Sequence, residues 1–188
     1  MAQSKQEIND LLAGSIKELT AKKSIDKIRI KDITDGAGVI RPTFYNHFQD
    51  KYELIEWIME HELIEPIKPL LDNGMISAAV MLLLKNIERE KTFYTAVSMM
   101  EGQDTFETIA TRLVANVLED IMSERPEHVI KEHPWMTKKM IASYFAKTMS
   151  FVVKEWIESG MPIDAAEMVD VYDILMKTSL VDVLSEKG

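Results

Sequence analysis

Residues 70–125 contain no proline, and the whole chain of 188 residues has only six prolines and seven glycines. Apolar residues recur every three or four positions, whereas the strict alternation that is typical of strands is hard to find. That spacing places apolar side chains on one face of a helix, and proline and glycine are the main helix breakers. The sequence therefore predicts an all-α fold.

Composition narrows the class of protein. Apolar residues make up 46% of the chain and charged residues 28%, as in a globular domain. The absence of cysteine excludes disulfides, thiolate metal sites and cysteine nucleophiles. No apolar stretch is long enough to cross a membrane, and Glu7 and Asp10 interrupt the apolar core that a signal peptide needs. We therefore expect a cytoplasmic protein without a membrane partner.

Motifs of catalysis are absent from the sequence. It has no GxxxxGK phosphate loop, no GxSxG elbow and no HExxH pair, and its carboxylates show no spacing that differs from surface charge. His61, His128 and His133 are too scattered to predict a metal site. We therefore expect a protein that is not an enzyme and needs no cofactor.

Charge is distributed unevenly along the chain. Residues 1–51 carry nine Lys and Arg against seven Asp and Glu, whereas the other 137 residues carry 13 against 24. The net charge of −9 is thus the sum of +2 on the N-terminal part and −11 on the rest. The acidic body argues against extensive non-specific binding of nucleic acid. The mildly basic N-terminal part is compatible with nucleic-acid binding by that part alone.

The first helix is expected to begin after Ser4, which forms a capping box with Glu7, and to end near Lys22 and Lys23, where cations suit the helix dipole. Its apolar residues, which fall on one face, are Ile8, Leu11, Leu12, Ile16 and Leu19.

Two short helices with a tight turn follow. One is predicted over residues 31–37, where Gly38 can end it in the left-handed conformation, and the other over residues 42–48, with Pro42 at its first position. Their proportions are those of a helix-turn-helix, in which the second helix enters a major groove of DNA. The apolar residues that lock the pair together are Ile33, Ala37, Val39, Phe44 and Phe48.

A longer helix is expected to begin after Asp50, which forms a capping pair with Glu53, and to run to about residue 61. Lys51 at its start combines its own charge with the free amides of the first turn, an arrangement that suits a phosphate. The buried face of this helix consists of Leu54, Ile55, Ile58 and Met59.

The second short helix leaves polar side chains free for a ligand, namely Arg41, Thr43, Tyr45, Asn46 and His47. Arginine pairs with guanine, asparagine pairs with adenine, and the other three types bind phosphate oxygens. The alternative is an ordinary helical hairpin with Phe44, Tyr45 and Phe48 in its core. That alternative explains neither the polar pair after Tyr45 nor the position of Lys51.

The run TFYNHF, followed by Lys51 and Leu54, resembles the recognition-helix signature of the TetR family of transcriptional regulators. The resemblance implies that Lys31, Arg41, Pro42 and Asn46 approach base edges, and that Thr43, Tyr45, His47 and Lys51 hold phosphates. Ile40 departs from the family, which often has a small polar capping residue there. The first turn of the recognition helix is therefore expected to lack a polar side-chain cap. Ile40 is instead a candidate for contact with a thymine methyl.

Two longer stretches, TFYNHFQDKYELIEWIMEHEL and KNIEREKTFYTAVSM, resemble a branch of this family that includes activators of dihydroxyacetone-kinase operons. In that branch the sensing partner is a kinase-subunit-like protein rather than a free small molecule.

Beyond Pro66 and Pro69 the chain is expected to form a body of longer helices, over residues 72–89, 92–100, 105–123, 137–159 and 164–185. The last two are apolar on more than one face, which predicts a homodimer formed through them. In the first of these two, one apolar stripe contains Ile141, Tyr144, Phe145, Thr148, Val152 and Trp156.

Several residues of the body are candidates for the lining of an effector cavity or, equally, for core filling: Met81, Tyr94, Met99, Met100 and Trp156. The acidic cluster of Glu101, Asp104 and Glu107 is expected to be a solvated loop and helix start.

Together these features predict a helix-turn-helix DNA-binding domain over residues 1–50 and a helical effector-binding and dimerisation domain over residues 51–188. We expect a homodimer that binds a palindromic operator in double-stranded DNA, under control of a small molecule or a kinase-subunit-like partner protein. The alternative is an all-α homodimeric interaction or ligand-binding module without sequence-specific DNA binding, which the net charge and Ile40 favour.

Overall fold

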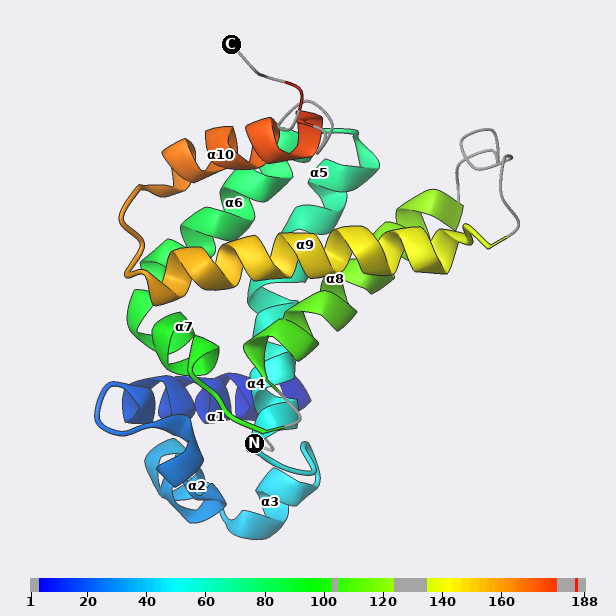
Figure 1. Cartoon of the computed structure of the whole chain (residues 1–188). Helices are drawn as coiled ribbons and strands as arrows, with labels where there is room; N and C mark the ends of the chain where they lie inside the picture. The colour runs from blue at the N-terminus through cyan, green and yellow to red at the C-terminus, as the bar shows by residue number, and fades with distance from the viewer. Residues whose placement is uncertain (1–3, 103–104, 124–134, 179–184, 186–188) are drawn as a thin grey trace.

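The structure, a computed structural model, describes residues 4–102, 105–123, 135–178 and 185. Within these residues every regular element is a helix, which confirms the all-α prediction. Three helices form a small group at one end of the molecule, and the others form a larger group above it (Figure 1). We call residues 4–50 the head and the described residues from 51 onward the body.

The head contains α1 (Lys5–Thr20), a 3-10 turn (Ile25–Lys27), α2 (Ile30–Ala37) and α3 (Arg41–Tyr45). The predicted capping box is present at α1, where the Ser4 hydroxyl accepts from the Glu7 amide at 3.2 Å and the Glu7 carboxylate accepts from the Ser4 amide at 2.6 Å. Gly38 ends α2 with φ of 68°, as predicted. α1 ends at Thr20, short of the two lysines that were expected to close it.

The apolar core of the head forms as the spacing predicted, with one exception. Ile33 and Phe44 are fully buried and Phe48 is nearly so, and they join Leu12 of α1 in one core. Leu11, expected on the same face, is exposed. Consecutive residues lie about 100° apart around a helix, so Leu11 falls at the edge of a face that α2 and α4 cover only in part.

Helices α1 and α2 approach closely at a glycine. The Ser15 hydroxyl on α1 donates to the carbonyl of Ile33 at 2.8 Å. A Cβ atom added to Gly36 on α2 would lie 2.3 Å from that hydroxyl oxygen, which is far inside van der Waals contact. Gly36 therefore sets the distance between the two helices.

The connection between head and body is helical throughout. α4 (Lys51–Met59) continues into a π turn (Glu60–Ile64), a 3-10 turn (Glu65–Ile67) and α5 (Lys68–Asp72). Pro66 and Pro69 stand at the second positions of the last two segments, within the first turn, where a missing amide proton costs little. The chain thus passes from the head deep into the body as one rod-like segment (Figure 1).

The rest of the body contains α6 (Ile76–Arg89), α7 (Lys91–Ser98), α8 (Phe106–Ser123), α9 (Lys138–Glu158) and α10 (Ala165–Lys177). These match the predicted helices except at their ends. The predicted helix 72–89 starts four residues later, and α10 ends at Lys177 instead of residue 185. Most of that difference, residues 179–184, lies outside the described part of the chain.

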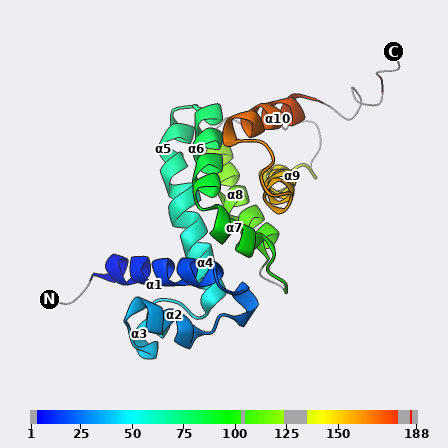
Figure 2. The ribbon, with the colours of Figure 1, turned by 90° about the vertical axis from the view of Figure 1, so that its left-hand side faces the viewer.

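Most of the apolar stripe that the sequence of α9 shows lies away from the core, although Trp156 of that stripe is buried. Ala142, Ala146 and Ser150 are buried, whereas Tyr144 is 63% exposed. Small side chains let α8 and α9 pack closely, so the aromatic side of α9 points outward. Figure 2 shows α9 and α10 as an outer layer of the body. Large apolar side chains exposed there are Tyr144, Phe145, Phe151, Ile174, Leu175 and Met176.

We predict that Gly36→Ala lowers the free energy of unfolding by about 1–3 kcal/mol, although alanine favours helix, because the new Cβ overlaps the Ser15 hydroxyl. In a Ser15→Ala background the nearest atom of residue 15 is its Cβ at 3.3 Å, so the same change costs less. Urea unfolding of the four proteins measures the difference.

Gly14→Ala, at an exposed position of α1, is the matched control, since nothing lies within 4 Å of its Cβ position. We expect it to be neutral or stabilising. An equal cost of Gly36→Ala in both backgrounds is the result that contradicts the close approach.

Candidate nucleic-acid interface

Helix α3 lies at the end of the head farthest from the body (Figure 1). Phe44 faces the core, whereas Arg41, Pro42, Tyr45 and Asn46 are exposed and Thr43 is half-buried. The helix is shorter than predicted, because it ends at Tyr45 with Asn46 as its C-cap. Polar side chains of the expected recognition segment thus share an accessible edge of the head.

The first turn of α3 has no polar side-chain cap, as the isoleucine at position 40 predicted. Ile40 is the N-cap residue, makes no side-chain capping hydrogen bond and is 68% exposed. Pro42 stands in the first turn, where its fixed φ favours a helix without the aid of a polar cap.

Arg41 and Tyr45 are held as a pair on the exposed face of α3. The Arg41 guanidinium donates to the Tyr45 hydroxyl at 3.2 Å and lies 5.8 Å from the centre of the ring. Tyr45 in turn packs edge-on against buried Phe44, with ring centres 5.6 Å apart. These contacts orient a positive group and a hydroxyl at the surface before any ligand binds.

His47 is half-buried and is positioned by a residue that the sequence analysis did not single out. Its Nδ1 lies 2.6 Å from the side-chain oxygen of Asn9 on α1. Asn9 is buried on the core-facing side of α1, and its place in line with Leu12 and Ile16 was its only signal in the sequence. The contact leaves Nε2 of His47 as the second hydrogen-bonding atom of the ring.

Lys51 lies where the sequence placed it, at the start of α4, but its ammonium group has partners within the protein. It donates to the carbonyl oxygens of Ile25, Asp26 and Ile28 at 2.8, 3.1 and 3.1 Å. Burial lowers its pKa from the ordinary value, against the opposing effect of nearby Asp26 and Asp50. Lys51 therefore ties α4 to the segment between α1 and α2.

The start of α2 carries a cluster of basic and acidic side chains. The carboxylate of Asp32 accepts from Lys23 Nζ at 2.7 Å and from the Arg29 amide at 2.9 Å. The hydrogen bond from Lys23, followed by those from Arg29, holds the pKa of Asp32 well below its ordinary value of 3.8. Lys31 is exposed and pairs with Asp35 at 2.7 Å, and a surface ion pair of this kind contributes little to stability.

Two ion pairs tie the helical connection to neighbouring elements. Lys17 of α1 lies 2.7 Å from Glu62 and 3.4 Å from Glu90. Arg112 of α8 makes two hydrogen bonds to the carboxylate of Glu56 on α4, one of them 2.9 Å long. The partners lie 45 to 73 residues apart in sequence, and for that reason local patterns did not reveal them.

The candidate cavity residues of the sequence analysis do not line the two apolar cavities of the body. Tyr94 and Trp156 are buried, and the Trp156 indole donates to the carbonyl of Ile163 at 2.9 Å. Met100 is also buried, whereas Met99 is 61% exposed. The cavities are lined by other, mostly apolar residues of the segment from α4 to α6 and of α8, α9 and α10.

Among the residues that the structure describes, no group of three or more His, Asp or Glu side chains is placed to hold a metal ion. His128 and His133, dismissed as ligands from the sequence, and Asp104 of the acidic cluster lie outside the described residues. No helix within the described ranges is both long and apolar enough to span a membrane.

The fold and the site together have the architecture of a helix-turn-helix regulator: a small helical head with an exposed short helix, attached to a larger helical body. Residues 15–58 match the model of bacterial regulatory proteins of the tetR family, and residues 76–178 match that of a transcriptional regulator C-terminal region. The chain belongs to the TetR family of transcriptional regulators. This confirms the family resemblance seen in the recognition segment and the expectation that the protein is not an enzyme.

Individual proteins are similar over most of the chain. The HTH-type dhaKLM operon transcriptional activator DhaS of Lactococcus lactis is 25% identical over 156 residues, which cover 82% of this chain and 81% of DhaS. Three solved structures share the fold. The dihydroxyacetone kinase operon activator DhaS has a TM-score of 0.64 at 23% identity, with 90% of this chain and 93% of the other covered.

The second solved structure is NalD, the secondary repressor of the MexAB-OprM multidrug efflux pump in Pseudomonas aeruginosa, with a TM-score of 0.61, 17% identity and coverage of 92% and 96%. The third is the fatty acid degradation regulator FadR of Bacillus halodurans, with a TM-score of 0.58, 14% identity and coverage of 94% and 100%. Activators and repressors thus share this architecture.

We predict that Lys51→Met lowers the stability of the protein by about 1–3 kcal/mol, because three backbone carbonyls lose their shared donor. The matched control is Lys27→Met, which removes the same charge from an exposed position in the neighbouring turn. Urea unfolding midpoints measure both. Equal midpoints for the two variants are incompatible with a structural role for Lys51.

We also predict a pH-dependent effect of Asp32→Asn. Because the folded-state pKa of Asp32 is lowered, its ionised form stabilises the fold above pH 3.8, and this stabilisation is lost as pH falls from there toward the lowered value. The difference in urea midpoint between wild type and Asp32→Asn is therefore largest near neutral pH and shrinks below pH 3.8. A difference that grows on acidification is the contrary result.

Proposed function

We propose that this protein binds a palindromic operator in double-stranded DNA as a homodimer, through a DNA-binding domain over residues 1–50. The observation that carries the proposal is the surface of α3. Its buried side anchors the helix through fully buried Phe44, while Arg41, Tyr45 and Asn46 are exposed at the end of the head remote from the body. A short helix presented in this way fits the major groove.

We assign contacts with base edges to Lys31, Arg41, Pro42 and Asn46, and contacts with phosphates to Thr43, Tyr45, His47 and Lys51. Arginine and asparagine make bidentate pairs with guanine and adenine. Lys51 and His47 already have partners within the head, so their contribution to phosphate binding includes the positioning of α3 and α4. Removal of one direct phosphate contact lowers the slope of log affinity against log salt by about 0.9.

The homodimer is supported by the outer layer of the body. Large apolar side chains on α9 and α10 are exposed, and Tyr144, Ile174 and Leu175 are each at least half exposed. Apolar surface of this extent is typical of a subunit interface. In a dimer with twofold symmetry the two copies of α3 reach successive major grooves, about 34–36 Å apart.

Control is assigned to the domain over residues 51–188, through a small molecule or a partner protein. Support comes from the connection between the two parts, in which α4 and its continuation reach from the head to the interior of the body. The ion pairs of Lys17 with Glu62 and of Arg112 with Glu56 link that segment to α1 and to α8. A change of packing in the body therefore reaches the head through contiguous contacts.

Selection of duplexes from a random DNA pool at about 100 mM salt tests the function, because specific binding survives screening that weakens non-specific contacts. We expect enrichment of an inverted repeat, and a dimer by sedimentation. An Arg41→Ala/Asn46→Ala variant, altered only at exposed positions, is expected to enrich nothing. A wild-type protein that folds and dimerises but enriches no duplex favours instead an interaction or ligand-binding module.

We predict that Arg41→Ala weakens binding to the selected operator by about 1–3 kcal/mol and relaxes the base preference at one position of each half-site. Lys85→Ala is the matched control, since it removes one positive charge from an exposed position of α6 in the body. Fluorescence anisotropy with operator and single-base variants measures both effects. An equal loss on every sequence places Arg41 among the phosphate contacts instead.

A further inference from the structure

Two adjoining apolar cavities lie inside the body. The larger has a volume of about 260 Å³ and lies between α5, α6 and α8, against the π turn of the helical connection. The smaller, of about 50 Å³, lies between α4, α6, α8, α9 and α10. Ile64, Val114 and Met149 line both, so the two spaces share part of their walls.

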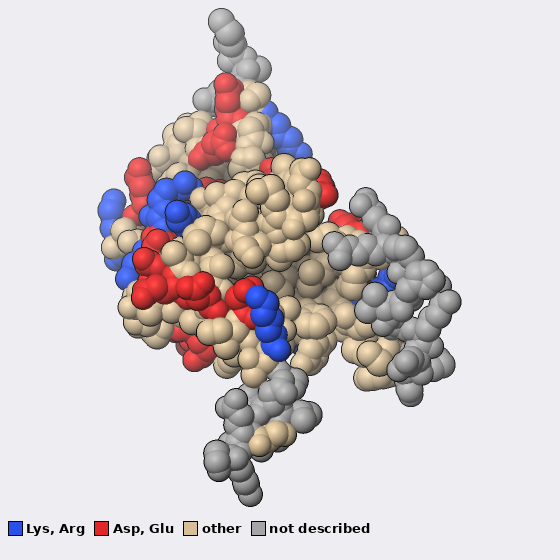
Figure 3. Space-filling model, turned by 90° about the horizontal axis from the view of Figure 1, so that it is seen from above, with Lys and Arg blue, Asp and Glu red and all other residues tan. Residues whose placement is uncertain are grey.

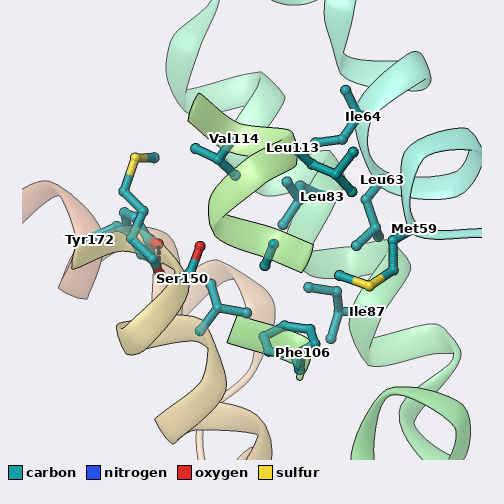
Figure 4. A pocket seen from close by; sticks show the side chains of 13 residues that line it. Met59, Leu63, Ile64, Leu83, Ile87, Phe106, Leu113, Val114, Ser150 and Tyr172 are labelled. Atoms are coloured by element: carbon teal, nitrogen blue, oxygen red, sulfur yellow. Dashed lines mark hydrogen bonds between the residues drawn. The ribbon is translucent and has the colours of Figure 1, made fainter. Parts of the chain in front are cut away.

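One polar atom in the smaller cavity lacks a partner. Ser150 of α9 is 3% exposed, and its hydroxyl has no hydrogen-bond partner among the described residues. Figure 4 shows this hydroxyl oxygen pointing into the cavity, among apolar side chains such as Val114 and Leu83. The other hydroxyl in the lining, that of Tyr172, already donates to the carbonyl of Met149 at 2.6 Å. Burial of an unpaired hydroxyl is unfavourable, so Ser150 gains from any ligand that pairs with it.

The lining defines the chemical class of that ligand. Neither cavity has a charged residue in its wall, so a carboxylate or phosphate would lose its hydration without a counter-ion. An aliphatic chain, in contrast, gains from burial against leucine, isoleucine, valine and methionine side chains. Methionine is flexible, and Met149 can therefore move aside to join the two spaces.

We propose that the body binds a neutral, mainly aliphatic molecule with a single hydroxyl or carbonyl group, whose polar end pairs with Ser150 and whose chain fills the larger cavity. The proposal rests on the proposed function in one respect: this molecule serves as the effector. Leu63 and Ile64 of the π turn line the site, and the preceding residue, Glu62, holds Lys17 of the head. Occupancy therefore acts on the segment that connects body and head.

The test uses 1-octanol as the probe and octanoate at pH 8 as its charged counterpart, with binding to the full chain followed by calorimetry and by the shift in Tm. We expect saturable binding of octanol, a concentration-dependent rise in Tm, and at least tenfold weaker binding of octanoate. Octanoate that binds as tightly as octanol, or no saturable binding of octanol, overturns the proposal.

Ser150→Ala tests the polar end of the site. Because the hydroxyl has no partner in the free protein, we expect this variant to be as stable as wild type or more stable, yet to bind octanol about fivefold more weakly. Ser98→Ala is the matched control. Ser98 is equally buried, but it lies on α7 outside both cavities, and we expect octanol affinity to be unchanged. Equal octanol affinity in wild type and Ser150→Ala contradicts the assignment.

Ala79→Leu tests the larger cavity. Ala79 is buried and lines it, so the larger side chain fills the space and abolishes octanol binding while the protein remains folded by circular dichroism. Should this variant fail to fold, Val117→Ile, a smaller addition to the same wall, is expected to weaken octanol binding in its place. Undiminished octanol binding by a folded variant excludes this cavity.

Duplex selection on the same protein separates the two proposals. Enrichment of an inverted repeat without octanol binding overturns the ligand site and leaves DNA binding intact. Octanol binding that depends on Ser150, with no duplex enriched, supports the ligand site and contradicts the proposed function.

Discussion

Head and body share one buried surface, the apolar face of α4. Leu54, Ile55 and Ile58 are fully buried, and they belong to a single core that continues from α1 into the body. Full burial of one such side chain contributes about 1.5–3 kcal/mol, so displacement of the head from α4 uncovers apolar surface at high cost. The orientation of α3, which α2 and the core of the head support, therefore follows the position of α4.

Polar contacts fix the orientation of the head relative to α4. Lys51 binds three carbonyls of the segment between α1 and α2, and Lys17 reaches Glu62 beyond α4. Partly exposed ion pairs contribute only about 0–1 kcal/mol each, so their main effect is to select one relative position of the helices. The head is consequently held by an apolar core that supplies the energy and by a few charged groups that specify the geometry.

The charges of the surface and the apolar interior of the body suit different ligands. Seen from above, the end of the body opposite the head shows a broad uncharged area with both acidic and basic side chains around it, so basic groups do not dominate this face as they do on a surface that binds DNA (Figure 3). The exposed polar edge of α3 lies at the other end, and the cavities lie between the two. The proposed DNA contact and the proposed ligand contact thus lie in distinct parts of one chain, joined by the continuous segment from α4 to α5.

The sequence by itself determined the features that depend on near neighbours: helical periodicity, the Ser4 cap, the left-handed turn at Gly38, and the TFYNHF run that indicates the family. These follow from interactions among residues a few positions apart. The tertiary structure alone decided the partners of Lys51, the contact of His47 with Asn9, the outward turn of the aromatic side of α9, and the cavity residues. Each depends on which distant helix covers a given face, and packing of the whole chain, not local spacing, sets that.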